Sequence, residues 1–125
     1  GEPLLRVDDE RRSRSRRKGW LSRRGYEIVT ADSASHAIEL FNREPHAFAL
    51  LITDYSMPEM NGTELARCLI GIRTDLPVIL TTGYSEYLSE KTIRQIGIRA
   101  LVMKPLVMAQ LSSTIAEAMG SGDGG

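Results

Sequence analysis

Short apolar stretches alternate with helical patterns along this chain of 125 residues. Each stretch is too short for a helix and is typical of a strand buried on both faces. The stretches cover residues 4–7, 26–31, 48–52, 78–82 and 100–103. The connections between them are too long for hairpins. We therefore expect an α/β domain in which a five-stranded parallel sheet carries five helices on its two faces.

Local signals predict several helix boundaries. Ser33 is a suitable N-cap for the second helix, whose apolar residues recur at helical spacing. Asn61 and Gly62 form a turn before a new helical pattern begins at Leu65. Gly97 is expected to end the fourth helix.

Polar residues stand where the predicted parallel strands end. Asp8 and Asp9 follow the first stretch, and Asp54 follows the third. Thr82 closes the fourth stretch, and Lys104 follows the fifth. The carboxyl ends of parallel strands share one edge of the sheet, where open α/β sheets bind their ligands. Three acids, a hydroxyl and a lysine at this edge predict a site for a cation and a phosphoryl group.

The three carboxylates favour a bound metal ion. Two unit charges about 4 Å apart near a protein surface repel by roughly 4 kcal/mol, so crowded carboxylates need a cation or a shared proton. All-oxygen ligands suit Mg2+, which keeps several waters and accepts phosphate oxygens. The structural alternative is that Asp8 and Asp9 cap a helix and Asp54 starts a turn. The combination with Thr82 and Lys104 favours the functional interpretation.

Four segments resemble a known family, the receiver domain of two-component response regulators. The segments are residues 7–10, 54–62, 78–85 and 103–106, in the order and at the spacing of the family. The resemblance extends from Leu4 to about Met119. It implies a flavodoxin-like, doubly wound fold with strand order 2-1-3-4-5 and the site at the topological switch point. We expect a receiver domain over residues 4–119 and a flexible tail over 120–125.

The resemblance also implies roles for the residues at the strand ends. Asp54 would be the phosphoacceptor, attacking phosphorus donated by the phosphohistidine of a histidine kinase or phosphotransfer domain. Asp9 and Asp54 would bind Mg2+ directly, with the backbone carbonyl of Ser56 as a third ligand. Asp8 would act through water, and Lys104 would pair with a phosphoryl oxygen.

Further positions are implied to control switching. The Thr82 hydroxyl would turn inward to bond a phosphoryl oxygen; Thr81 competes for this role, but Thr82 matches the family position. Leu101 stands where the family usually has an aromatic residue, so the readout surface is expected to differ. Ser56 and Tyr84 resemble positions that set phosphoryl lifetime in the family, so the resemblance implies the same role for them here. Phosphorylation would change the surface of the fourth helix, fifth strand and fifth helix, to which a downstream effector binds.

The first expected helix has lost most of its apolar face. Residues 11–24 hold eight of the sixteen basic residues, and only Trp20 and Leu21 remain as anchors. Each buried aliphatic side chain contributes roughly 1.5–3 kcal/mol, so we expect this helix to be poorly docked, frayed or shifted in register. The alternative explanation is that the basic run itself is an artefact in the sequence. Nucleic-acid binding is disfavoured because the formal net charge is zero.

Composition limits the cellular context. A single cysteine, Cys68, excludes an internal disulfide and fits a reducing compartment; we expect it to be a small packing residue of the third helix. No apolar run reaches the roughly 20 residues of a membrane span, and no signal-peptide pattern is present. We expect a cytoplasmic protein without membrane contact, with His36 and His46 as surface residues.

Two other functions could use the same residues. A small Mg2+-dependent phosphatase would use Asp54 as its nucleophile and would need a pocket for an external phosphate ester. A receiver-like interaction module would not be phosphorylated. The segment Thr82-Gly83-Tyr84-Ser85 is similar to receivers attached to sensor histidine kinases, so a hybrid kinase parent stands beside a stand-alone receiver as an expectation.

Overall fold

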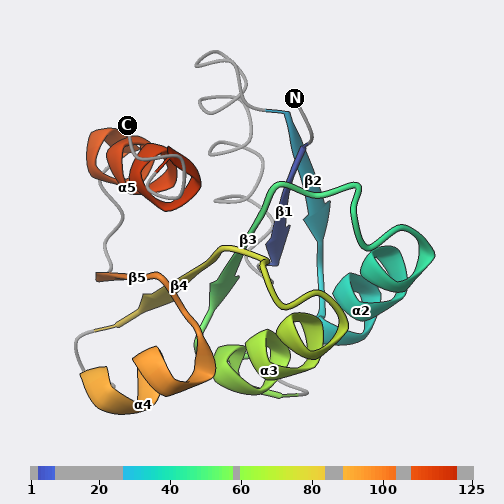
Figure 1. Ribbon diagram of the computed structural model, residues 1–125, viewed down its shortest axis with the longest axis horizontal. Helices are drawn as coiled ribbons and strands as arrows, with labels where there is room; N and C mark the ends of the chain where they lie inside the picture. The colour runs from blue at the N-terminus through green and yellow to red at the C-terminus, as the bar shows by residue number, and fades with distance from the viewer. Residues whose placement is uncertain (1–2, 8–26, 58–59, 84–88, 104–107, 121–125) are drawn as a thin grey trace.

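The computed structural model describes residues 3–7, 27–57, 60–83, 89–103 and 108–120. Its centre is a five-stranded sheet with the order β2-β1-β3-β4-β5, and all neighbouring strands are parallel (Figure 1). The strands are β1 (Leu4–Val7), β2 (Ile28–Ala31), β3 (Leu50–Asp54), β4 (Val78–Thr82) and β5 (Ala100–Met103). This confirms the predicted parallel sheet and the implied strand order.

Helices lie on both faces of the sheet. The described helices are α2 (Ala34–Arg43), α3 (Gly62–Ile72), α4 (Glu90–Ile96) and α5 (Met108–Gly120). Figure 1 shows α2, α3 and α4 on one face and α5 on the other, so the sheet is doubly wound as expected. The expected first helix, and the hypothesis that it docks poorly, lie outside the described residues. None of the described helices combines the length and the hydrophobicity of a membrane-spanning segment.

The sheet separates two hydrophobic clusters. Successive residues of a strand point to opposite faces, so Leu4 and Leu50 belong to the cluster beneath α5. Leu5 and Leu51 belong to the cluster beneath α2, α3 and α4. The cluster beneath α5 contains the apolar residues predicted for that helix, Leu111, Ile115 and Ala118. Burial on both faces explains why the strands are apolar without alternation.

β3 (Leu50–Asp54) begins and ends later in the chain than the apolar stretch of residues 48–52. Its pairing begins with Leu50 opposite Leu4 of β1 and continues to Asp54 opposite Thr81 of β4. The bounds of the strand therefore follow from its register with both neighbours, and not from hydrophobicity alone. As a result, Asp54 belongs to the strand itself and is held by the sheet backbone.

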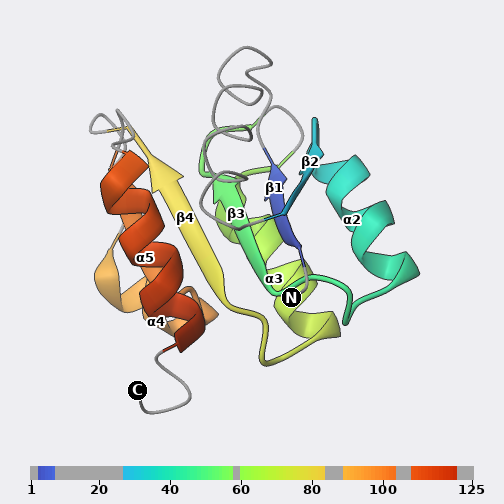
Figure 2. The same cartoon turned by 90° about the horizontal axis from the view of Figure 1, so that it is seen from above.

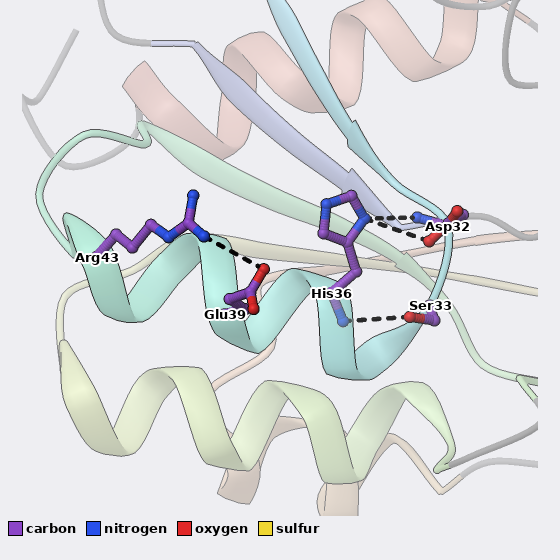
Figure 3. Close-up of polar contacts among 5 residues, drawn as sticks. All are labelled: Asp32, Ser33, His36, Glu39 and Arg43. Carbon is purple, nitrogen blue, oxygen red and sulfur yellow. Dashed lines mark hydrogen bonds and ion pairs between the residues drawn. The ribbon is translucent and has the colours of Figure 1, made fainter.

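Side-chain caps start the helices that follow β2 and β3. Ser33 is the N-cap of α2, as predicted, and its Oγ accepts a hydrogen bond from the backbone N of His36 at 3.1 Å (Figure 3). α3 begins at Gly62, earlier than its apolar pattern, because Asn61 and Glu64 form a capping box. Each side chain of this box accepts a hydrogen bond from the other's backbone N at 2.9 Å.

Two predictions about helix residues had opposite outcomes. Gly97 ends α4 as predicted, with a positive φ of 106° that favours glycine. The prediction for Cys68 was wrong, because its side chain is exposed. Leu65 and Leu69 belong to the buried face of α3, and Cys68 lies about 100° around the helix from Leu69.

Candidate functional site

Asp54 lies in the middle of the edge formed by the carboxyl ends of the strands. It is the last residue of β3, which has β1 on one side and β4 on the other (Figure 2). Its side chain is on the α5 face of the sheet, because Leu50 and Ile52 precede it at alternate positions and belong to that cluster. The residue is only 3% exposed, and burying a carboxylate is costly unless it is hydrogen-bonded or paired.

Thr81 supplies a hydrogen bond to this carboxylate. Its Oγ1 donates to Asp54 Oδ1, and both residues are buried. The two residues are register partners in adjacent parallel strands, so their side chains point to the same face. A backbone hydrogen bond from Tyr55 N to Thr81 O, 2.8 Å long, holds the two strands together at this level.

Thr82 points to the opposite face of the sheet. It is 1% exposed, and its Oγ1 lies 3.4 Å from Sδ of Met103, its register partner on β5. The structure thus brings Thr81, and not Thr82, to the Asp54 carboxylate. The inward turn of Thr82 toward a phosphoryl oxygen stays a prediction.

Gly62 packs directly against the backbone of Asp54. A Cβ added to Gly62 would lie 2.3 Å from Asp54 O and 2.6 Å from Cδ1 of Leu80. Gly62 N also donates to Tyr55 O at 2.8 Å, and Thr53 Oγ1 donates to Asp54 O at 3.1 Å. The backbone at the site is therefore tightly fitted. The sequence indicated only a turn at Gly62, because this contact joins residues that no local pattern connects.

β5 presents exposed apolar side chains beside Thr82. Leu101 is 38% exposed and Met103 is 45% exposed. Leu101 is the register partner of Leu80, and Met103 is the partner of Thr82, so both face the side of the sheet on which α4 lies. The predicted switch position Leu101 is therefore at the surface, on the edge strand.

Four predicted site residues, Asp8, Asp9, Tyr84 and Lys104, lie outside the described residues. The described strands end immediately before two of these segments: β1 ends at Val7, paired with Thr53, and β5 ends at Met103, paired with Thr82. Ser56, the predicted donor of a carbonyl ligand, is exposed in the segment that follows β3.

The described ligand atoms fit Mg2+ in kind. Asp54 offers carboxylate oxygen and Ser56 a backbone carbonyl, and oxygen atoms are the ligands that Mg2+ prefers. Within the part of the chain that the structure describes, no three His, Cys, Asp or Glu side chains are grouped closely enough to hold a metal ion. The two remaining predicted carboxylates, Asp8 and Asp9, are not in that part.

Arg6 is a buried charge that lies on the same sheet face as Asp54. It is 1% exposed and is the register partner of Ile52, two residues before Asp54 on β3. Arginine is almost never fully buried without a partner. Arg6 therefore places a charged side chain within a strand that is covered on both faces.

Polar residues of α2 and of the segment just before it pair with near neighbours in the sequence. His36 Nδ1 lies 3.2 Å from Asp32 Oδ1, and Arg43 Nη2 lies 3.5 Å from Glu39 Oε1 (Figure 3). The side chain of His36 is 40% exposed. These contacts join neighbours on one helix or its cap, which is typical of a solvated helix surface.

A second ionic group tethers the segment before β4. Arg73 Nε donates to Asp75 Oδ1 at 2.9 Å, and Arg73 Nη1 donates to Pro45 O at 3.1 Å and to Phe48 O. The hydrogen bond and charge of Arg73 lower the pKa of the Asp75 carboxyl from its ordinary value. This group precedes β4, whereas Asp54 and Thr81 lie where the strands end.

Comparison with known proteins places the chain among signalling domains. Residues 4–116 match the family model described as response regulator receiver domain. A chemotaxis protein CheY homolog of Campylobacter jejuni is 30% identical over 125 residues, covering 97% of this chain and 95% of that protein. Chemotaxis protein CheY1 of Helicobacter pylori is 32% identical over 127 residues, covering 96% and 98%.

Longer relatives match over only part of their length. Two-component response regulator ARR10 of Arabidopsis thaliana is 35% identical over 86 residues, which are 69% of this chain but 15% of that protein.

Solved structures give the same fold. A response regulator receiver domain protein from Clostridium thermocellum superposes with a TM-score of 0.91 at 25% identity, covering 98% of both chains. A CheY-like receiver domain protein from Methanospirillum hungatei has a TM-score of 0.83 at 29% identity, covering 98% of this chain and 96% of that one.

Proposed function

The chain belongs to the family of response regulator receiver domains of two-component systems, and from this premise we propose that it is a phosphoacceptor switch of a phosphorelay, with Asp54 as the acceptor. The observation that carries the proposal is the position of Asp54: a nearly buried carboxylate ending the middle strand of the sheet, hydrogen-bonded by Thr81. Open α/β sheets bind their ligands outside the carboxyl ends of the strands.

The proposed reaction is an in-line transfer. A carboxylate oxygen of Asp54 attacks the phosphorus of a phosphohistidine, and the P–N bond breaks. The electron pair of that bond stays on the imidazole nitrogen, which takes up a proton, and Asp54 becomes an acyl phosphate. Such a reaction needs mainly positioning and charge neutralisation. The sheet backbone holds Asp54 at the end of β3, which supports the positioning part of this proposal.

The proposed site binds Mg2+ directly through Asp9, Asp54 and the backbone carbonyl of Ser56, and through water to Asp8. The oxygen atoms that Asp54 and Ser56 offer are ligands that Mg2+ prefers. When bound, Mg2+ would neutralise negative charge on the carboxylates and on the phosphoryl oxygens. Lys104 is proposed to pair with a phosphoryl oxygen. Its ammonium would offset the charge that accumulates in the transition state.

The proposed output is a change in the surface formed by α4, β5 and α5. Thr82 would turn toward the phosphoryl group and leave its contact with Met103. The side chain of Leu101, on the same edge strand as Met103, would change its position in response. The exposure of Leu101 and Met103, which lie on the same side of the sheet as Thr82, supports this proposed change of surface. Ser56 and Tyr84 are proposed to set the lifetime of the acyl phosphate.

The partners are proposals from family membership. They are a histidine kinase or phosphotransfer domain as donor, and a downstream effector on the α4-β5-α5 surface, in the cytoplasm. Residues 4–119 would form the receiver domain, and a hybrid kinase parent stays a prediction.

Incubation with Mg2+ and phosphoramidate tests this function against its rivals. We expect intact-mass spectra to show one added phosphoryl group that is absent in Asp54→Ala. In a parallel incubation with Mg2+ and a phosphate ester, continuous hydrolysis of the ester far beyond one equivalent would instead indicate a phosphatase. No added mass and no turnover would indicate an interaction module.

A further inference from the structure

Two adjacent threonines at the end of β4 face opposite sides of the sheet. Thr81 Oγ1 donates to the Asp54 carboxylate, whereas Thr82 Oγ1 lies against Met103 Sδ. The residue that contacts the acceptor carboxylate is therefore not the one expected to respond to phosphorylation. Resting on the proposed function, we propose that Thr81 is a positioning residue, whose hydroxyl fixes the orientation of the Asp54 carboxylate for attack on the phosphoryl donor.

The hydroxyl of Thr81 is held in place by its surroundings. Thr81 is fully buried and is the register partner of Asp54. Its carbonyl accepts the hydrogen bond of Tyr55 N, so its backbone is tied to the residue that follows the acceptor. A β-branched side chain also has few χ1 rotamers in a strand. The donor is thus preorganised before any phosphoryl group arrives.

The hydrogen bond from Thr81 can fix the orientation of the Asp54 carboxylate. The χ2 torsion of an aspartate is broad and roughly two-fold, so the backbone alone does not define which oxygen faces outward. Thr81 engages one oxygen, Oδ1. On this proposal the other oxygen is the nucleophile, and Oδ1 becomes the carbonyl oxygen of the acyl phosphate with the Thr81 hydroxyl still bound to it.

Two substitutions separate the hydroxyl from the shape of the side chain. Thr81→Val keeps the β-branched shape and removes the donor, and Thr81→Ser keeps the donor. Rates of phosphorylation by phosphoramidate at saturating Mg2+ are measured by quenched intact-mass spectrometry. Because a hydrogen bond to a charged group is stronger than one between neutral groups, we expect phosphorylation of Thr81→Val to be slower by about tenfold or more. The phosphorylation rate of Thr81→Ser is expected to lie within about threefold of the rate of the unsubstituted chain.

Thr30→Val is the matched control, since it makes the same chemical change at a half-buried position of β2. It is expected to leave the rate unchanged. A second readout is independent of phosphorylation: urea midpoints of Thr81→Val, Asp54→Ala and the double variant. We expect Thr81→Val to lower the midpoint clearly when Asp54 is present and much less in Asp54→Ala, since the hydrogen bond links the two residues.

Failure of this inference is distinguishable from failure of the proposed function. If the unsubstituted chain is phosphorylated and Thr81→Val reacts equally fast, Thr81 has no positioning role and the acceptor function stands. A Thr81→Ser variant as slow as Thr81→Val would also overturn the inference. If the unsubstituted chain takes up no phosphoryl group, the proposed function fails and the inference fails with it.

Discussion

Gly62 lies so close to the carbonyl oxygen of Asp54 that a side chain at this position would overlap it. An added Cβ would be 2.3 Å from that oxygen, and the carbonyl belongs to the sheet backbone, which cannot move aside without disturbing β3. The first helical residue of α3 therefore has to be glycine for steric reasons, and the start of α3 is fitted against the acceptor strand.

Gly62→Ala is predicted to destabilise the domain and to slow phosphorylation of Asp54. Overpacking of a close-packed site costs about 1–3 kcal/mol, and the required backbone shift moves the acceptor itself. Gly71→Ala is the matched control on the same helix, because a Cβ there meets nothing within 4 Å. It should stabilise the domain by about 0.5–1 kcal/mol. Urea unfolding of both variants measures the difference; equal stabilities would contradict the steric account.

Ser33→Ala is predicted to lower stability by about 1 kcal/mol, because the Oγ that caps α2 is lost. Ser33→Asp, which keeps an acceptor oxygen at the N-cap, should retain most of the stability. Thermal denaturation followed by circular dichroism compares the three proteins. A Ser33→Asp variant as unstable as Ser33→Ala would show that the cap does not act through this oxygen.

The pair of Arg73 and Asp75 predicts a pH dependence of stability. The pKa of Asp75 is lowered in the folded state by Arg73. A lowered folded-state pKa stabilises the fold at pH values above the unfolded value of about 3.9, and this contribution is lost as the pH falls through the folded-state pKa. Asp75→Asn should therefore be less stable than the unsubstituted chain near neutral pH, and the difference should shrink in acid. Urea midpoints measured from pH 7 to pH 3 check this, and a difference that grows in acid would contradict it.

Thr82→Val is predicted to separate phosphorylation from its output. The Thr82 hydroxyl faces Met103 and not the Asp54 carboxylate, so Thr82→Val should still take up one phosphoryl group. The phosphorylation-dependent change in hydrogen exchange of residues 100–103 should be reduced. An unchanged exchange response of β5 would show that Thr82 does not transmit the signal.

Much of the fold could be predicted from the sequence because the strand signal is local. The bounds of β1, β4 and β5 and the cap at Ser33 agree with the apolar runs and the residues that flank them. Position 68 was misjudged because an apolar-spacing argument does not define the edge of the buried face: Cys68 is near Leu69 in sequence but points outward.

The site was harder to predict because it depends on register between strands. The sequence indicates that Asp54 and the two threonines end neighbouring strands, but not which threonine shares a face with the carboxylate. Pairing of Asp54 with Thr81 decides this, and a shift of one residue would have exchanged the two hydroxyls. The contact of Gly62 with Asp54 is likewise a tertiary contact between two chain segments.

Locating the phosphoryl group tests most directly whether Asp54 is the acceptor. After incubation with Mg2+ and phosphoramidate, the chain is digested at low temperature and the peptides are sequenced by tandem mass spectrometry. We expect a single modified residue, Asp54, and no modification in Asp54→Asn. A phosphoryl group on any other residue, or equal labelling of Asp54→Asn, would contradict it.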